Sequence, residues 1–195
     1  VIAMASSGLH SNGYSLVRSV LARTGAPLEG HVDEFGRTLG EELLEPTRLY
    51  TRLCLELVER FGVEGIHAYS HVTGGGLGAN LSRVLPVSAV ATVDRSSWTV
   101  PPVFDWVRRG GDVTWAGMED SLNLGVGMVG VVGAQSAEEV LRISRAAGVD
   151  AWVLGEVSFP SEPPVDSGTF EGRVVSGTKG VNGGAVRLRG DYRVG

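Results

Sequence analysis

The chain has 195 residues, of which 43% are hydrophobic and 20% are charged, and its formal net charge at pH 7 is −5. This composition predicts one soluble globular domain with an apolar core and excludes a disordered or fibrous protein. Because the lysines and arginines are not clustered, we expect no nucleic-acid partner. No apolar run approaches the roughly 18 residues of a membrane span, and residues 1–5 lack the charged-then-apolar layout of a signal peptide, so we expect no membrane partner either.

Cysteine and glycine contents narrow the class of protein further. Cys54 is the only cysteine, so a disulfide framework and a thiolate metal site are excluded, which suits the cytoplasm. Its apolar neighbours predict a thiol packed in the core rather than a nucleophile. The 29 glycines are about twice the usual share. We therefore expect turns where the backbone takes a positive φ or approaches a ligand closely.

The first predicted elements, in chain order, are a strand, a glycine loop and a helix. The apolar residues 1–5 predict the end of a buried strand, and since no initiator methionine precedes them, we expect the chain to be a piece of a longer protein. Residues 14–21 have apolar side chains at helical spacing. Ser11 or Asn12 is the expected N-cap of this helix, and Gly25 is its expected end.

A second strand, glycine loop and helix follow in the same order. Residues 26–40 are polar and irregular, after which Pro46 is expected to open a long amphipathic helix that ends at Gly62. Residues 65–70 alternate as a short strand does, and a glycine turn leads from them to a helix around residues 81–85.

The second half of the chain continues the alternation of strands and helices. Strands are predicted at residues 87–93, 127–132, 150–159 and 185–188, and helices at 101–109 and 136–147. The second of these helices opens with a capping-box pattern, Ser136 followed at the third position by Glu139. Residues 160–184 are rich in Pro, Gly, Ser and Thr, so we expect a mobile segment before the last strand.

These elements predict an α+β fold, a layered α/β/α domain with a mixed β-sheet. The connections between strands and helices vary in length, which favours this class over a regular doubly wound sheet. We assign residues 1–159 to the α/β domain and residues 160–195 to a Gly/Pro-rich tail with a possible final strand.

The loop after the first strand is the first candidate site. Gly8 and Gly13 allow the backbone to fold sharply, and unpaired amides at the start of the following helix attract an anion such as phosphate or carboxylate. Five polar side chains add hydrogen-bonding groups: Ser6, Ser7, His10, Ser11 and Asn12. The alternative is that the polar residues only cap the helix and that the glycines only turn the chain.

A second candidate site follows the strand at residues 65–70. Its sequence is His71-Val72-Thr73-Gly74-Gly75-Gly76. Three consecutive glycines cost backbone entropy, and a ligand that approaches the backbone closely would explain them. His71 can serve as a proton carrier or as a donor to an oxyanion, given its ordinary pKa of about 6.5. The alternative is a hydrogen-bonded histidine at a strand end.

Two further patterns are weaker. Gly125 and Gly127 resemble half of a dinucleotide-binding fingerprint, but the glycine spacing ends too soon and a strand follows, so a β-bulge is the simpler interpretation. Arg48 is expected in the first turn of a helix, where it opposes the helix dipole, and an anionic partner nearby would explain it. No carboxylate pair or His-x₃-His spacing predicts a metal site in this chain.

Together these segments resemble one family, phosphoribosylformylglycinamidine cyclo-ligase, also called aminoimidazole ribonucleotide synthetase. The resemblance covers order as well as content. It rests on ASSGLHSNGYSL at 5–16, PTRLY at 46–50, HVTGGG at 71–76, SSW at 96–98, and M-x-x-x-x-N-x-G-V-G-M at 118–128. The segment after Phe159 carries no such resemblance.

The resemblance implies the fold of the carboxy-terminal domain of that superfamily and an ATP-dependent ring closure. In the family, ATP phosphorylates the formyl amide oxygen of formylglycinamidine ribonucleotide, and an internal nitrogen then displaces phosphate to give aminoimidazole ribonucleotide. The family also uses Mg²⁺, which is held with ATP mostly by an amino-terminal domain, and the full-length enzyme is a homodimer. That domain's acidic, glycine-rich motif is absent here, so we expect the chain alone to be inactive.

The resemblance also assigns site residues. One wall of the cleft is expected from Ser6, Ser7, Gly8, His10, Ser11 and Asn12, and another from His71, Thr73, Gly74, Gly75 and Gly76. His10 and His71 are the candidates for polarising or protonating the substrate, while Arg48 and Asn123 are candidates for positioning it. Two alternatives stay open: a non-catalytic domain that binds a phosphate ligand, and a paralogous ATP-dependent enzyme such as formylglycinamidine ribonucleotide synthetase.

Overall fold

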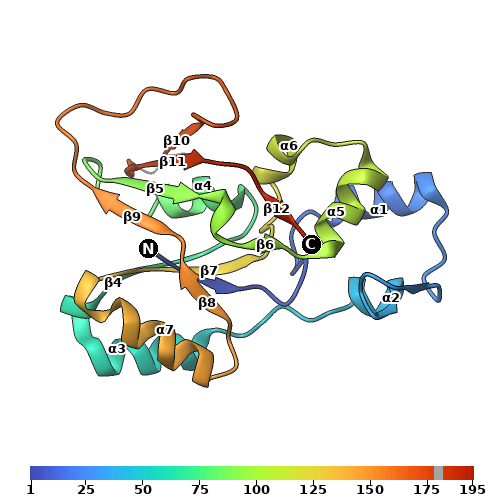
Figure 1. The fold of residues 1–195 in the computed structure, drawn as a ribbon, viewed down its shortest axis with the longest axis horizontal. Helices are drawn as coiled ribbons and strands as arrows, with labels where there is room; N and C mark the ends of the chain where they lie inside the picture. The colour runs from blue at the N-terminus through green and yellow to red at the C-terminus, as the bar shows by residue number, and fades with distance from the viewer. Residues whose placement is uncertain (178–181) are drawn as a thin grey trace.

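The computed structural model describes residues 1–177 and 182–195, and its fold is α+β, as predicted (Figure 1). The first of two four-stranded sheets contains, in order, β4 (Ile66–His71), β7 (Val126–Val132), β1 (Ile2–Ala5) and β8 (Ala151–Val153). Its neighbouring strands are all antiparallel. The second contains β10 (Val174–Ser176), β11 (Ala185–Arg189), β5 (Val90–Asp94) and β9 (Gly155–Ser158). It is mixed, as predicted, because β11 runs parallel to β5.

Two helices, α3 (Thr51–Gly65) and α7 (Ala137–Ala146), lie together on one face of the first sheet (Figure 1). Ile2 and Met4 of β1 pack against both helices in one apolar cluster. Ala3 belongs to the larger cluster on the opposite face of the sheet. Successive side chains of a strand point to opposite faces, so this short apolar strand is buried on both sides.

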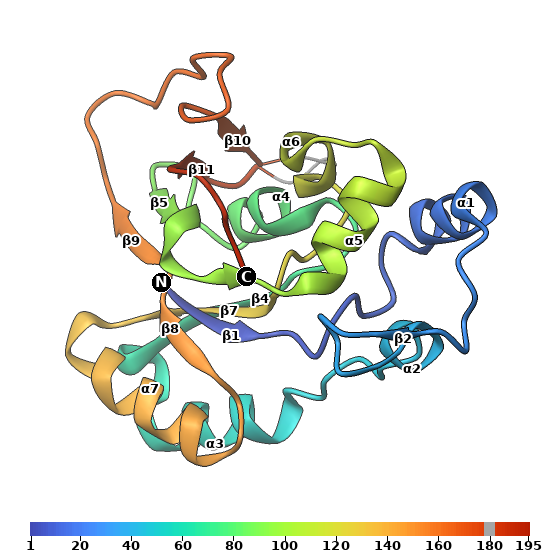
Figure 2. The ribbon, with the colours of Figure 1, turned by 45° about the vertical axis from the view of Figure 1, so that its right-hand side comes forward.

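The larger apolar cluster joins the other face of the first sheet to the second sheet and to the remaining helices of the described residues. Figure 2 shows the second sheet on the side of the first sheet opposite α3 and α7. These helices are α1 (Tyr14–Thr24), α2 (Leu39–Leu43), α4 (Gly76–Ser82), α5 (Pro102–Gly111) and α6 (Trp115–Glu119). Two short strand pairs also occur, β2 (His31–Val32) with β3 (Arg37–Thr38) and β6 (Thr99–Val100) with β12 (Arg193–Val194). In the part of the chain that the structure describes, every helix is too short or too polar to cross a membrane.

The start of α1 differs from the prediction, whereas its end agrees. Gly25 ends the helix in the left-handed conformation at φ 62°, as expected of a C-terminal glycine. The N-cap is Gly13 at φ 76°, without a side-chain capping bond, so the prediction of Ser11 or Asn12 is wrong. The Ser11 hydroxyl instead lies 3.2 Å from the Thr47 hydroxyl.

The helix predicted to open at Pro46 begins at Thr51. Residues 46–50 are not helical, and the Tyr50 hydroxyl ties this segment to the first strand by donating to the Ala5 carbonyl at 2.7 Å. The prediction that Arg48 occupies a first helical turn is therefore wrong. The helix breaks at Gly62, whose backbone is not helical at φ 56° and ψ −165°, so the end predicted at Gly62 agrees, and the last turn to Gly65 follows this kink.

The capping box occurs at a different helix from the predicted one. Ser136 makes no capping bond because its backbone is already helical, at φ −93° and ψ −13°, at the end of a 3₁₀ turn (Ala134–Ser136). Thr38 has the extended backbone of an N-cap, at φ −70° and ψ 156°, and forms a capping box with Glu41 at the start of α2. The stretch 26–40 is therefore partly ordered by the β2–β3 pair and this cap, not irregular throughout.

Three predictions in the second half need correction. The strand predicted at 150–159 is two strands in different sheets, β8 and β9, which are separated by Leu154 alone. The helix expected around 81–85 is α4, which begins directly at Gly76. Within the segment expected to be mobile, β10 pairs with β11, and residues 178–181 lie outside the described residues. The strand predicted at 185–188 is confirmed as β11, beside β5, but it is not the last, because β12 follows it.

Candidate functional site

The fold brings three of the sequence motifs to one end of the first sheet. Strands β1 and β4 both run antiparallel to β7, so they run parallel to each other and their carboxyl ends lie together. The first loop, residues 6–13, leaves β1 there, and the second loop, residues 72–76, leaves β4. A Cβ placed on Gly74 would lie 3.8 Å from the Asn12 side-chain oxygen, so the two loops are neighbours.

A third segment, the linking segment (residues 119–125), leads into β7 at the same end of the sheet. Its Glu119 carbonyl lies so close to the second loop that a Cβ on Gly76 would be only 1.5 Å from the oxygen. Leu122 packs against the first loop, where a Cβ on Gly13 would lie 2.0 Å from Leu122 Cδ2. The linking segment therefore supports both glycine loops.

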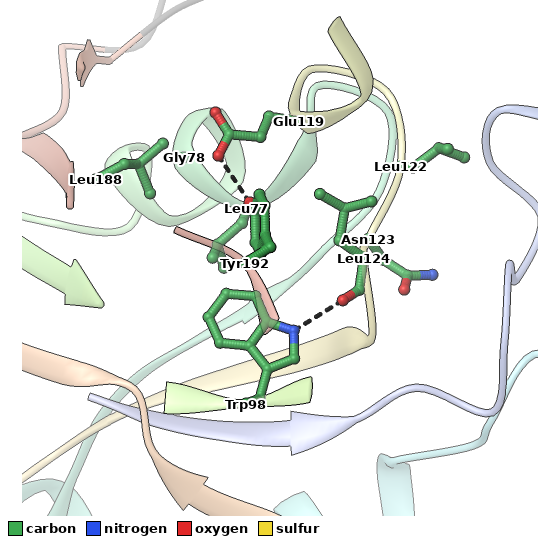
Figure 3. A pocket seen from close by; sticks show the side chains of 9 residues that line it. All are labelled: Leu77, Gly78, Trp98, Glu119, Leu122, Asn123, Leu124, Leu188 and Tyr192. Carbon is green, nitrogen blue, oxygen red and sulfur yellow. Dashed lines mark hydrogen bonds between the residues drawn. The ribbon is translucent and has the colours of Figure 1, made fainter. Parts of the chain in front are cut away.

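Asn123 and Trp98 show how the linking segment is fixed. The Asn123 amide donates to the Gly8 and Leu9 carbonyls at 3.0 and 3.1 Å, and its oxygen accepts from the Gly125 amide at 2.8 Å. Asn123 is only 2% exposed, so it positions the first loop from beneath. The Trp98 indole, from the SSW motif, donates to the Leu124 carbonyl at 2.8 Å (Figure 3).

His10 is buried and takes part in the framework of the site. Its backbone is left-handed at φ 57°, and its Nε2 accepts from the backbone amides of Ser7 at 3.1 Å and Arg48 at 3.4 Å. The ring proton must therefore lie on Nδ1, which has no hydrogen-bond partner among the described residues. Burial, followed by the charges of His71 and Arg48, lowers the pKa of His10 to about 4. His10 is thus neutral at pH 7, with an Nδ1–H donor that has no partner among the described residues.

His71 is the exposed histidine of the pair, at the carboxyl end of β4. Its ring centroid lies 6.4 Å from that of His10 and 6.2 Å from that of Tyr50. It borders a hollow of about 340 Å³ whose lining includes Tyr50, Cys54 and Tyr69. Burial raises the pKa of Cys54 to about 11, which agrees with a packed thiol rather than a nucleophile, and burial also raises the pKa of both tyrosines.

Gly127 makes room for these rings. Met4 pairs with Met128 and Ala5 with Val126, so Gly127 is the extra residue of a β-bulge, which confirms the interpretation of the glycine pair. A Cβ on Gly127 would lie 1.9 Å from the Tyr50 hydroxyl and 2.7 Å from His10 Cε1. Only glycine allows the Tyr50 and His10 rings to pack against the strand here.

The serines of the first loop mostly face the segment 46–50. The Ser7 hydroxyl donates to the Pro46 carbonyl at 2.6 Å, and Ser6 Oγ is buried without a partner among the described residues. The Arg48 guanidinium donates to the Gly148 carbonyl at 2.9 Å. Its Nε is buried without a partner among the described residues, so a positioning role for Arg48 stays a prediction.

The second loop has internal support that the sequence analysis missed. Asn80, on α4, donates to the Thr73 and Gly76 carbonyls at 3.2 and 2.6 Å and accepts from the Thr73 hydroxyl at 3.2 Å. Gly75 and Gly76 adopt φ values of 112° and 69°, so these two glycines are needed for the turn. The sequence does contain a sign of this role. Asn80 is a polar residue one helical turn after Gly76, between the apolar Leu77 and Leu81.

The described residues contain no group of three or more His, Cys, Asp or Glu side chains that could hold a metal ion. Glu42 and Glu45 lie beside Gly8 of the first loop, and both carboxylates pair with Arg37.

A family described as "AIR synthase related protein, C-terminal domain" matches residues 1–160. The chain belongs to this family. The matched part ends just after β9, so β10, β11 and β12 lie beyond it.

Three relatives have cyclo-ligase names. The "Putative phosphoribosylformylglycinamidine cyclo-ligase" of Streptomyces fradiae is 49% identical over 195 residues, covering 100% of this chain and 97% of that protein. The phosphoribosylformylglycinamidine cyclo-ligase of Symbiobacterium thermophilum is 48% identical over 162 residues, 81% of this chain and 45% of that protein. The corresponding protein of Sorangium cellulosum is 44% identical over 178 residues, which cover 91% of this chain and 49% of that protein. The chain thus spans about half the length of the latter two. The match to the first covers the segment after Phe159 as well, so the expectation that this segment carries no resemblance is wrong.

Proposed function

We propose that this chain supplies part of the active-site cleft of a phosphoribosylformylglycinamidine cyclo-ligase in purine biosynthesis. The observation that carries the proposal is the convergence of the two glycine loops at one end of the first sheet, with the exposed His71 beside them. The 49% identity to a cyclo-ligase-named protein over 195 residues supports the choice of this enzyme.

The proposed reaction begins when the formyl amide oxygen of formylglycinamidine ribonucleotide takes the terminal phosphate of ATP. An internal nitrogen then attacks the activated carbon, phosphate leaves, and the imidazole ring of aminoimidazole ribonucleotide forms with ADP as the other product. Both substrates carry phosphate, so the enzyme must hold two anionic groups close together while charge develops on the oxygen.

The residues of this chain suit distinct parts of that task. Gly13 caps α1 without a side-chain bond, and the Leu16 amide donates to the Gly13 carbonyl at 3.0 Å, so the Tyr14 and Ser15 amides of the first turn remain available to a phosphate group. His71 is the histidine that a ligand reaches, and we assign it the role of donor or proton carrier at the reacting oxygen or nitrogen. His10, being buried and neutral, holds the first loop against residues 46–50.

ATP and Mg²⁺ are proposed to be held mostly by a second domain, which completes the cleft. Two relatives with the cyclo-ligase name are about twice as long as the part this chain matches, since it covers 45% and 49% of them. The described residues lack a cluster of metal-binding side chains. We further propose that the complete enzyme is a cytoplasmic homodimer and that this chain alone does not turn over substrate.

The test is an ATP-dependent assay for aminoimidazole ribonucleotide with the 195-residue chain alone, with the chain plus a separately expressed amino-terminal half, and with both halves in one polypeptide. We expect no product from the chain alone and product from the joined protein. A folded, joined protein that makes no product would refute the cyclo-ligase assignment. Phosphate binding without turnover in every sample would instead favour a non-catalytic binding domain.

A further inference from the structure

The side chain of Glu119 is the centre of a buried polar network outside the two glycine loops. Its partner Arg95 is fully buried, with 0% of the side chain exposed, and Glu119 is 5% exposed. The Arg95 guanidinium donates to both carboxylate oxygens, from Nε to Oε1 and from Nη2 to Oε2, the latter at 3.1 Å. This two-point contact fixes the direction of the carboxylate as well as its distance.

The other members of the network come from the segment beyond the family match. Tyr192 donates from its hydroxyl to Glu119 Oε1 at 2.7 Å (Figure 3), and Arg173 donates from Nη1 to Oε2 at 2.9 Å. The Phe170 ring covers Arg95, with 3.8 Å between Arg95 Cζ and the ring centroid. All three residues lie after residue 160, where the family match ends.

The same residue supports the second loop through its backbone. The Glu119 carbonyl occupies the space that a side chain on Gly76 would need. Three and four residues later, Leu122 and Asn123 contact the first loop at Gly13 and at the Gly8 and Leu9 carbonyls. A shift of Glu119 would therefore move the surface against which both loops pack.

We infer that Glu119 is a positioning residue and that the C-terminal segment, through Tyr192 and Arg173, holds it in place so that both glycine loops keep their relative geometry. The positioning itself is independent of what the loops bind, and only its effect on ring closure rests on the proposed function. Burial and the neighbouring Glu119 raise the pKa of Tyr192, so its hydroxyl keeps the proton that it donates.

A buried ion pair is a weak source of net stability, since apolar residues of similar volume often replace such a pair without loss. Apolar replacements lack the directional bonds that fix Glu119. A positioning role and a merely stabilising role can therefore be separated by variants that keep the global stability and lose the bonds.

The first experiment measures hydrogen exchange in the 195-residue chain. Tyr192→Phe removes one donor and leaves the ion pair, and the double variant Arg95→Met with Glu119→Leu replaces the pair by apolar side chains. Arg142→Met, which removes an exposed partner of Glu139 on α7, is the matched control. We expect the Gly76 and Gly125 amides to exchange about tenfold faster in the first two variants, with the Val129 amide in β7 unchanged.

Unchanged exchange at Gly76 and Gly125 would overturn the inference, because the loops would then not depend on the network. An equal increase at Val129 would also overturn it, because the variants would then only lower the global stability. In the joined enzyme, Tyr192→Phe is expected to raise KM about tenfold with kcat within about twofold, since it loosens the loops and leaves His71 in place. A wild-type joined enzyme without activity would refute the proposed function, and the exchange data would still decide the positioning role.

Discussion

Replacing Gly76 by alanine tests the close contact between the second loop and the linking segment. Gly76 has φ 69°, and a Cβ there would lie 1.5 Å from the Glu119 carbonyl oxygen and 2.6 Å from its carbon. Gly25 is a matched control, because its φ is 62° and a Cβ there would meet nothing within 4 Å. Both substitutions carry the backbone strain of a left-handed residue, and only Gly76→Ala adds the collision.

The expected costs can be separated on this basis. Left-handed backbone strain costs an L-residue about 1–2 kcal/mol, which is the whole loss expected for Gly25→Ala. Gly76→Ala adds an overpacking cost of about 1–3 kcal/mol, since a backbone carbonyl cannot swing away as a flexible side chain can. We therefore expect Gly76→Ala to lower the free energy of unfolding by about 2–5 kcal/mol, a large share of the total for a domain of this size.

Urea unfolding followed by tryptophan fluorescence measures both losses on one scale. The m-values should match the wild type, so that the midpoints report stability alone. Equal losses for Gly76→Ala and Gly25→Ala would mean that Glu119 does not press on the second loop, and the reasoning about the linking segment would fail with it.

Three other predictions concern the framework of the site. Folding lowers the pKa of His10 to about 4, so the folded state resists protonation of this ring. The free energy of unfolding should therefore fall by up to about 3 kcal/mol as the pH drops from 6.5 toward 4. His10→Asn removes the titrating ring, so its free energy of unfolding should depend less on pH. Gly127→Ala should cost about 1–3 kcal/mol in urea unfolding, because its Cβ would lie 1.9 Å from the Tyr50 hydroxyl. Asn123→Ala leaves the buried Gly8 and Leu9 carbonyls without their donor and should lower the Tm of the chain. His71 is exposed, so His71→Ala should leave the Tm within about 2 °C of the wild type and reduce only the activity of the joined enzyme.

The sequence predicts well the features that depend on local backbone chemistry. Gly25 ends α1 as expected, and the glycine pair at 125 and 127 marks a bulge. The positive φ of Gly75 and Gly76 agrees with the expectation of turns at positive φ in a glycine-rich chain, whereas the close approach of a ligand to these glycines stays a prediction. Each of these follows from the conformational freedom of a single residue type.

Features that depend on tertiary partners could not be predicted in this way. Thr38 and Ser136 open the same capping-box pattern, yet only Thr38 has the extended backbone that the cap requires. Asn80 and Glu119 are buried polar residues. Asn80 donates to the Gly76 carbonyl one helical turn earlier, and Glu119 accepts from Arg173 in the C-terminal segment. His10 and His71 seemed equivalent as candidates, and only their different burial separates a framework residue from an accessible one.

Leu154, the single residue between β8 and β9, restricts how the chain length can vary. Its amide donates to the Val1 carbonyl at 2.9 Å beside the first sheet, and its carbonyl accepts from the Asp94 amide at 3.1 Å beside the second. An insertion or deletion here would turn β9 over relative to β8 and send its inward side chains to solvent. We therefore expect length differences between homologues to avoid this corner and to collect in the largely exposed stretch 159–169.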